Sequence, residues 1–117
     1  MTTIITQAQG DCSSDTGLVT TFQVLVIQSG RDVTIVIPTS PVTRMAGQLI
    51  PPLNSSNPGN NWLLVFSGSM PDTGGTVTVS YRLELTSSST MSGLDNWQWT
   101  NGITTCYNGQ SSVTVSK

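Results

Sequence analysis

The clearest pattern in the sequence is a strict alternation of apolar and polar residues over residues 76–86. The apolar positions are Val77, Val79, Tyr81, Leu83 and Leu85, and polar residues occupy the positions between them. A period of two predicts a β-strand with one buried face and one face in water. Residues 62–67 are mostly apolar, and we expect them to pair with this strand as a hairpin through the turn-rich residues 68–75.

A second strand is predicted at residues 19–27, where apolar residues fall on both faces. Phe22, Val24 and Val26 share one face, whereas Leu25 and Ile27 lie on the other. Strands that are apolar on both faces are typical of central positions in a sheet, so we expect this strand to be covered on both sides.

The chain then turns through residues 28–32 into a strand at residues 33–37, which ends before Pro38 because proline has no N–H for the ladder. Four further prolines make residues 38–61 a long connection, with one short strand near residues 45–50.

The C-terminal part predicts another hairpin, because Asn101-Gly102 suits a two-residue type I′ turn. This turn would place Thr100 opposite Ile103, Trp99 opposite Thr104 and Trp97 opposite Cys106. Both tryptophans and the cysteine would then share one face, which we expect to be core.

First and last strands at residues 2–7 and 112–116 bring the number of strands to eight or nine. The predicted fold is all-β: a jelly-roll-like antiparallel β-sandwich of two sheets, in one domain over residues 1–117.

The amino-acid composition favours β-strands and limits the classes of molecule that the chain is expected to bind. The chain holds 18 Thr, 16 Ser and 11 Val but only 2 Ala, 1 Glu and 1 Lys, which favours strand over helix. With four basic residues and a net charge of −2, direct nucleic-acid binding is not expected. No apolar run approaches the ~20 residues that span a bilayer, so we expect no membrane insertion.

The two cysteines, Cys12 and Cys106, lie near opposite ends of the sequence. A disulfide between them would close a loop worth about 4 kcal/mol in the chain-entropy model. Two buried free thiols are the alternative, and the sequence leaves both open.

The sequence offers few candidates for catalytic or metal-binding residues. The absence of His removes the commonest general base and metal ligand. Asp15-Thr16-Gly17 and Asp72-Thr73-Gly74 resemble the catalytic loop of aspartic proteases, but their flanking residues differ and these residue types are ordinary turn formers. The remaining acids, Asp11, Asp32, Glu84 and Asp95, are scattered. We therefore expect no catalytic residue, no cofactor and no metal.

Aromatic residues offer a possible glycan contact, since indole rings stack on sugar faces. The core needs Trp97 and Trp99, whereas Trp62 stands beside Asn60 and Asn61 at a strand entrance. These three residues are the candidate surface for a glycan.

One stretch resembles a viral family. Residues 62–68 and 74–86, with a Gly turn, alternating Val, a Tyr and a Leu tail, resemble the last two strands of the jelly-roll shell domain in tombusvirus- and nodavirus-type capsids. Fewer than 80 residues precede the final strand and a basic RNA-binding arm is missing. The resemblance therefore implies a protruding or decorating domain, or part of a capsid chain. Protruding domains of this size in such viruses are typically β-sandwiches that dimerise and face receptors.

The sequence thus predicts a non-enzymatic structural protein of a virus particle, at the virion or outside the cell. It would associate with copies of itself and contact a host receptor or glycan. A carbohydrate-binding module is the alternative, and a dimeric aspartic protease built on Asp15 or Asp72 is the remote one.

Overall fold

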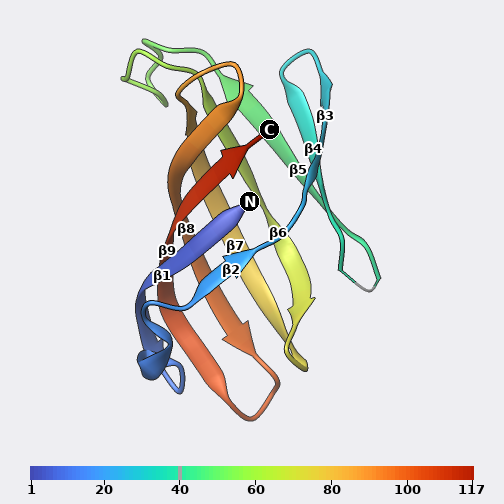
Figure 1. Ribbon diagram of the computed structural model, residues 1–117, viewed down its shortest axis with the longest axis vertical. Helices are drawn as coiled ribbons and strands as arrows, with labels where there is room; N and C mark the ends of the chain where they lie inside the picture. The colour runs from blue at the N-terminus through green and yellow to red at the C-terminus, as the bar shows by residue number, and fades with distance from the viewer. Residues whose placement is uncertain (40) are drawn as a thin grey trace.

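The computed structural model describes residues 1–39 and 41–117, and this part of the chain consists of nine β-strands and one short 3₁₀ helix (Figure 1). The elements are β1 (Thr2–Gly10), η1 (Ser13–Asp15), β2 (Val19–Thr21), β3 (Leu25–Ser29), β4 (Asp32–Ile37), β5 (Thr43–Ile50), β6 (Leu63–Asp72), β7 (Gly75–Leu85), β8 (Thr90–Thr100) and β9 (Thr105–Ser116). The predicted all-β class is confirmed.

All these strands belong to one antiparallel sheet in the order β2-β1-β9-β8-β7-β6-β5-β4-β3. From β3 to β9 each strand pairs with its neighbour in sequence, and β1 joins the end of this meander by pairing with β9. The sheet curls into an open half-barrel with one concave inner face (Figure 1). The predicted pair of sheets with jelly-roll connections is not confirmed. The number of strands and their alternation do not specify that β1 pairs with β9, far away in the sequence. This pairing joins β1 and β2 to the other strands in one sheet.

The core lies on the inner face of the curl. In β7 the alternation works as predicted, because Val77, Val79, Tyr81 and Leu83 are all at most 7% exposed. Phe66 of β6 stacks on Tyr81 with ring centroids 4.4 Å apart. Burying a side chain such as Leu83 contributes about 1.5–3 kcal/mol. The other buried core residues are Val33, Ile35, Ile37, Met45, Leu64 and Val113.

The hairpin of β6 and β7 is confirmed, but the expected eight-residue turn is wrong. Pairing continues to Asp72 opposite Gly75, so the turn contains only Thr73 and Gly74. Both have positive φ, 46° and 77°, as a type I′ turn requires. Only the two residues at the tip of the hairpin therefore form the turn.

The hairpin of β8 and β9 has a wider turn than predicted. Asn101 Oδ1 accepts hydrogen bonds from the backbone N–H of Ile103 at 2.9 Å and of Thr104 at 2.7 Å, which makes a four-residue connection. Trp99 consequently lies opposite Cys106 instead of Thr104, and Trp97 lies opposite Gly109 instead of Cys106 because the register shifts between the two tryptophans. At Trp99 the shift of two residues keeps the same face, and both tryptophans pack against the core, so the predicted common face of the tryptophans and Cys106 is confirmed.

The prediction of one central strand at residues 19–27 is wrong. This segment is divided into β2 and β3, which form the two edges of the sheet, and residues 22–24 cross between them (Figure 1). Leu25, Val26 and Ile27 are 58%, 42% and 51% exposed. Apolar residues on both faces do not reveal how many neighbouring strands a segment has.

Candidate functional site

A cavity of about 710 Å³ occupies one end of the curled sheet, next to the packed core. The walls are mainly apolar and aromatic, and they come from β1, β2, β4, β6, β7, β8 and β9. At its rim lie η1 and the turn between β6 and β7, which Figure 1 shows at the lower end of the molecule. The apolar and aromatic lining residues are Ile5, Leu18, Phe22, Ile37, Met70, Val77, Val79, Tyr81, Trp97 and Trp99.

Asp95 is the buried acid of this cavity. It is 3% exposed and lies on β8 between Tyr81 of β7 and Ser111 of β9 in the sheet register. Its Oδ1 has no hydrogen-bond partner within the described part of the chain. Burial raises the pKa of Asp95 to about 6, although the side chain and backbone of Ser111 act in the opposite direction. A carboxyl group is therefore held in a weakly polar site, and one of its oxygens is buried without a partner among the described residues.

Tyr81 is the nearest titratable group from the opposite strand. Burial raises the pKa of its phenol well above the usual value, and the charge of Asp95 adds to this effect. Tyr81 stays neutral at physiological pH, so it presents an aromatic ring and a hydroxyl group to the cavity.

Two indole rings are fixed in the cavity wall by their own hydrogen bonds. Trp97 Nε1 donates to Ser111 Oγ at 3.2 Å, and Trp99 Nε1 donates to the Asp72 carbonyl oxygen at 2.7 Å. Each ring also lies against a glycine: a Cβ at Gly109 would stand 2.2 Å from the ring of Trp97, and one at Gly75 would stand 2.5 Å from that of Trp99. Only glycine permits this approach, so both rings are positioned before any ligand arrives.

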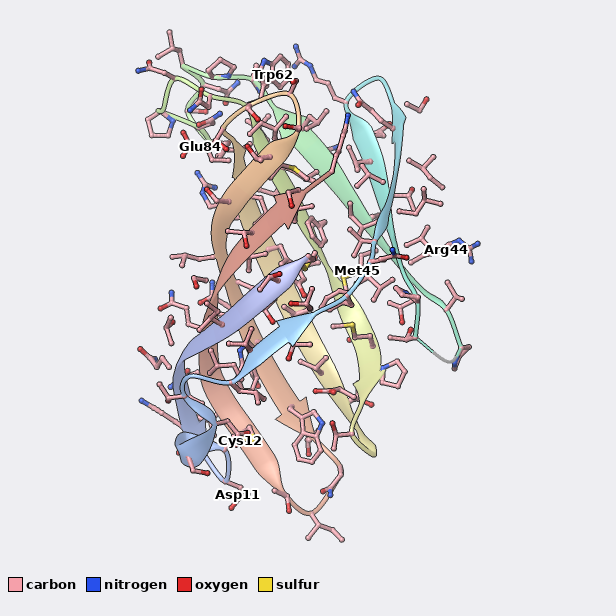
Figure 2. All side chains as sticks on the ribbon, viewed as in Figure 1. Asp11, Cys12, Arg44, Met45, Trp62 and Glu84 are labelled. Atoms are coloured by element: carbon pink, nitrogen blue, oxygen red, sulfur yellow. A yellow bond between two sulfur atoms is a disulfide. The ribbon has the colours of Figure 1, made fainter. Side chains whose placement is uncertain are left out.

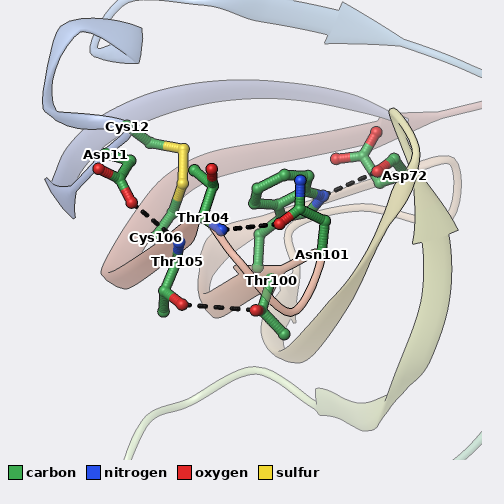
Figure 3. Close-up of a disulfide and its surroundings, with 9 residues drawn as sticks. Asp11, Cys12, Asp72, Thr100, Asn101, Thr104, Thr105 and Cys106 are labelled. Atoms are coloured by element: carbon green, nitrogen blue, oxygen red, sulfur yellow. Dashed lines mark hydrogen bonds between the residues drawn. A yellow bond between two sulfur atoms is a disulfide. The ribbon is translucent and has the colours of Figure 1, made fainter.

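Close to the rim, a disulfide joins Cys12 to Cys106, with Cα atoms 5.3 Å apart (Figure 3). The neighbouring Asp11 carboxylate accepts a hydrogen bond from the backbone N–H of Thr105 at 2.9 Å. Of the two states that the sequence left open, the structure thus contains the bridge. It holds the segment that leads into η1 against β9.

The predicted glycan contact lies far from this cavity. Figure 2 shows Trp62 at one end of the molecule and Cys12 at the other. Trp62 is 38% exposed, and the Arg31 guanidinium lies 5.6 Å from its ring centroid. Asn60 is exposed, while Asn61 Nδ2 donates to Glu84 Oε1 at 2.7 Å. Arg31 and Glu84 therefore already contact part of this surface.

The two Asp-Thr-Gly segments both reach the cavity. Asp15 comes from η1 and Asp72 from the end of β6, and each lines the cavity. The Asp72 carboxylate accepts a hydrogen bond from the Thr73 hydroxyl at 3.1 Å. Among the described residues no hydrogen bond joins Asp15 to Asp72.

Sequence reasoning did not select Asp95, although a signal was present. Asp95 is two residues before Trp97 and four before Trp99, so it shares their face of the strand. An acid in phase with two tryptophans that pack against the core is expected to face the core with them.

Neither a metal-binding cluster among the described residues nor a known relative helps to interpret this site. Within residues 1–39 and 41–117 no three acidic or cysteine side chains gather in a way that could hold a metal ion. No helix in the same ranges is long and apolar enough to cross a membrane. Comparisons of the chain with protein-family models, with curated proteins and with solved structures find no match.

Proposed function

We propose that this chain binds a small, largely apolar molecule in the cavity of the curled sheet. The observation that carries the proposal is the Asp95 Oδ1 atom, which is buried in the cavity wall without a partner in the described structure. Leaving a buried polar atom unpaired costs about 1–3 kcal/mol, so native structures avoid it unless the group has a task. A ligand that bonds to Asp95 would supply that partner.

The size and chemistry of the cavity support the same proposal. A volume of about 710 Å³ lies within the range of roughly 300–1,000 Å³ that is usual for small-molecule sites. Such sites combine apolar and aromatic walls with a few polar groups, and a carboxyl with a raised pKa among them is typical of a functional site. The fixed rings of Trp97 and Trp99 reduce the ordering that binding would require.

The test is a fragment screen with uncharged one- to three-ring aromatic compounds, monitored by amide chemical shifts. We expect shifts at lining residues and their loss in Ile5→Trp, which places an indole in the cavity. Ile4→Trp is the matched control, because Ile4 is the adjacent residue of β1 but is 41% exposed and does not line the cavity. If no fragment binds, or if both variants behave alike, the proposal is wrong.

A second candidate function is self-association through β3, as the predicted role in a virus particle would require. In the described structure β3 pairs with β4 alone, and its segment Leu25–Ser29 contains no charge and no proline. Uncharged edges with exposed apolar side chains readily pair with another strand, here β3 of a second copy. Light scattering should give a dimer for the native chain and a monomer for Ile27→Lys, with Leu94→Lys on the outer face of β8 as control. A native chain that remains monomeric at high concentration would refute this candidate.

Glycan binding at Trp62 and aspartic-protease activity stay predictions from the sequence. Loss of glycan-array binding in Trp62→Ala, with the fold retained, would support the first. Acid-optimum proteolysis that is lost in Asp72→Asn would support the second, and inertness toward unfolded substrates would remove it.

A further inference from the structure

The charges around the cavity are all of one sign. Asp15, Asp72 and Asp95 contribute carboxyl groups to its lining, while the described lining residues include neither Lys nor Arg, and the chain has no His. A concave apolar site with one sign of charge focuses its field on the bound molecule. Such a cavity attracts cations and repels anions.

We propose that the ligand is a small molecule with a protonated amine on an apolar or aromatic body, and that the amine binds Asp95. This inference rests on the proposed function, because it names the class of molecule that the same cavity would take. The amine would pair with the Asp95 carboxylate, which lines the cavity and whose Oδ1 lacks a partner in the described structure.

Asp95 is a better anchor for an amine than the two acids at the rim. Asp95 is 3% exposed, so little water would screen the attraction between its carboxylate and an amine. Hydrogen bonds between charged groups are shorter and about twice as strong as neutral ones. Asp72, in contrast, is exposed at the hairpin tip and already accepts a hydrogen bond from Thr73.

The aromatic residues next to Asp95 favour a cation as well. Val79 and Tyr81 on β7 are register partners of Trp97 and Asp95 on β8, which brings the phenol and the indole beside the carboxyl group. Both indole N–H groups in the wall already donate to protein oxygens, so an ammonium group could interact favourably with these rings only through a π-face. An ammonium group close to such a face gains about 0.5–2 kcal/mol.

The same arrangement predicts how amine binding depends on pH. Asp95 must be ionised to pair with the amine, so affinity should fall when acid protonates it. The groups that face it are Tyr81 from β7 and Ser111 from β9, with Asp15 and Asp72 in the same lining. Tyr81 is neutral at these pH values and Ser111 does not titrate.

The test uses matched triads of aromatic probes that share one frame and end in a primary amine, an alcohol or a carboxylate. 2-Phenylethylamine, 2-phenylethanol and phenylacetate form the smallest triad, and two- and three-ring frames extend the set. Binding is measured by calorimetry at neutral pH. We expect an amine to bind at least tenfold more tightly than its alcohol in one or more triads, and every carboxylate to bind more weakly than its alcohol.

Two variants test whether Asp95 causes the preference for amines over alcohols. Asp95→Asn should bring the amine and alcohol affinities within about twofold of each other while alcohol binding persists. Asp32→Asn removes the same charge from an exposed position on β4 and should leave the preference unchanged.

The outcomes separate the two proposals. If alcohols bind but no amine binds more tightly, or if Asp95→Asn keeps the preference, the amine inference is wrong and the cavity proposal stands. If no member of any triad binds, the cavity proposal fails and the amine inference fails with it.

Discussion

Asp95 should lower the stability of the ligand-free protein at neutral pH, and Asp95→Asn should therefore stabilise it. The pKa of this carboxyl is about 6 in the folded chain and 3.8 in its unperturbed state. Below pH 3.8 both states are protonated and Asp95 contributes no difference. Between these values the unfolded chain loses the proton while the folded chain retains it, so folded stability falls as pH rises and is lowest above pH 6.

The magnitude follows from the size of the shift. A difference of roughly two pKa units corresponds to at most about 3 kcal/mol. The asparagine amide must itself lie in the cavity wall, which reduces the gain, so we expect Asp95→Asn to raise the free energy of unfolding by about 1–3 kcal/mol at pH 7.5. The gain should vanish below pH 4.

Urea unfolding followed by tryptophan fluorescence between pH 3.5 and 8 measures this difference directly. The other acids are common to both proteins, so their titration cancels in the comparison. Asp32→Asn, at an exposed position, should stay within about 0.5 kcal/mol of the native chain throughout. A native chain that gains stability over Asp95→Asn as pH rises would mean that the ionised carboxylate is stabilised, and the reasoning would be refuted.

Three further variants test other parts of the structure by the same unfolding measurement. Replacing Cys12 and Cys106 by Ala should lower the free energy of unfolding by up to about 4 kcal/mol, because the bridge closes a separation of 94 residues, and an unchanged midpoint would contradict this. Gly109→Ala should cost about 1–3 kcal/mol and alter near-ultraviolet circular dichroism because its Cβ would overlap an indole ring, whereas Gly59→Ala has room and should change little. Thr73→Asn should stabilise the hairpin by about 1 kcal/mol, since Asn tolerates a φ of 46° better than Thr, and a lower midpoint would argue against the type I′ turn.

Local periodicity predicted much of the sheet. Val77, Val79, Tyr81 and Leu83 of β7 are buried because alternation fixes the face of a strand whatever its partners. The same rule placed Trp97 and Trp99 on the core side even though the predicted turn was too short, because alternation fixes their common face whichever residues of β9 lie opposite them.

The long-range features could not be predicted in this way. The position of β3 at an edge depends on which strands it meets, and Leu25 and Ile27 carry no information about that. The cavity depends on how tightly the sheet curls and on the two glycines beneath the indole rings. The candidate site therefore needed the structure, although the phase of Asp95 relative to Trp97 could have identified the acid.

The short link between β2 and β3 limits how the sheet can deform. Only residues 22–24 connect the two edge strands. The four Cα intervals from Thr21 to Leu25 span at most about 14 Å. The Phe22 N–H also donates to the Met1 carbonyl oxygen at 2.9 Å, which ties the link to the start of β1. The link therefore keeps the end of β2 close to the start of β3, and the sheet cannot flatten without breaking a strand ladder.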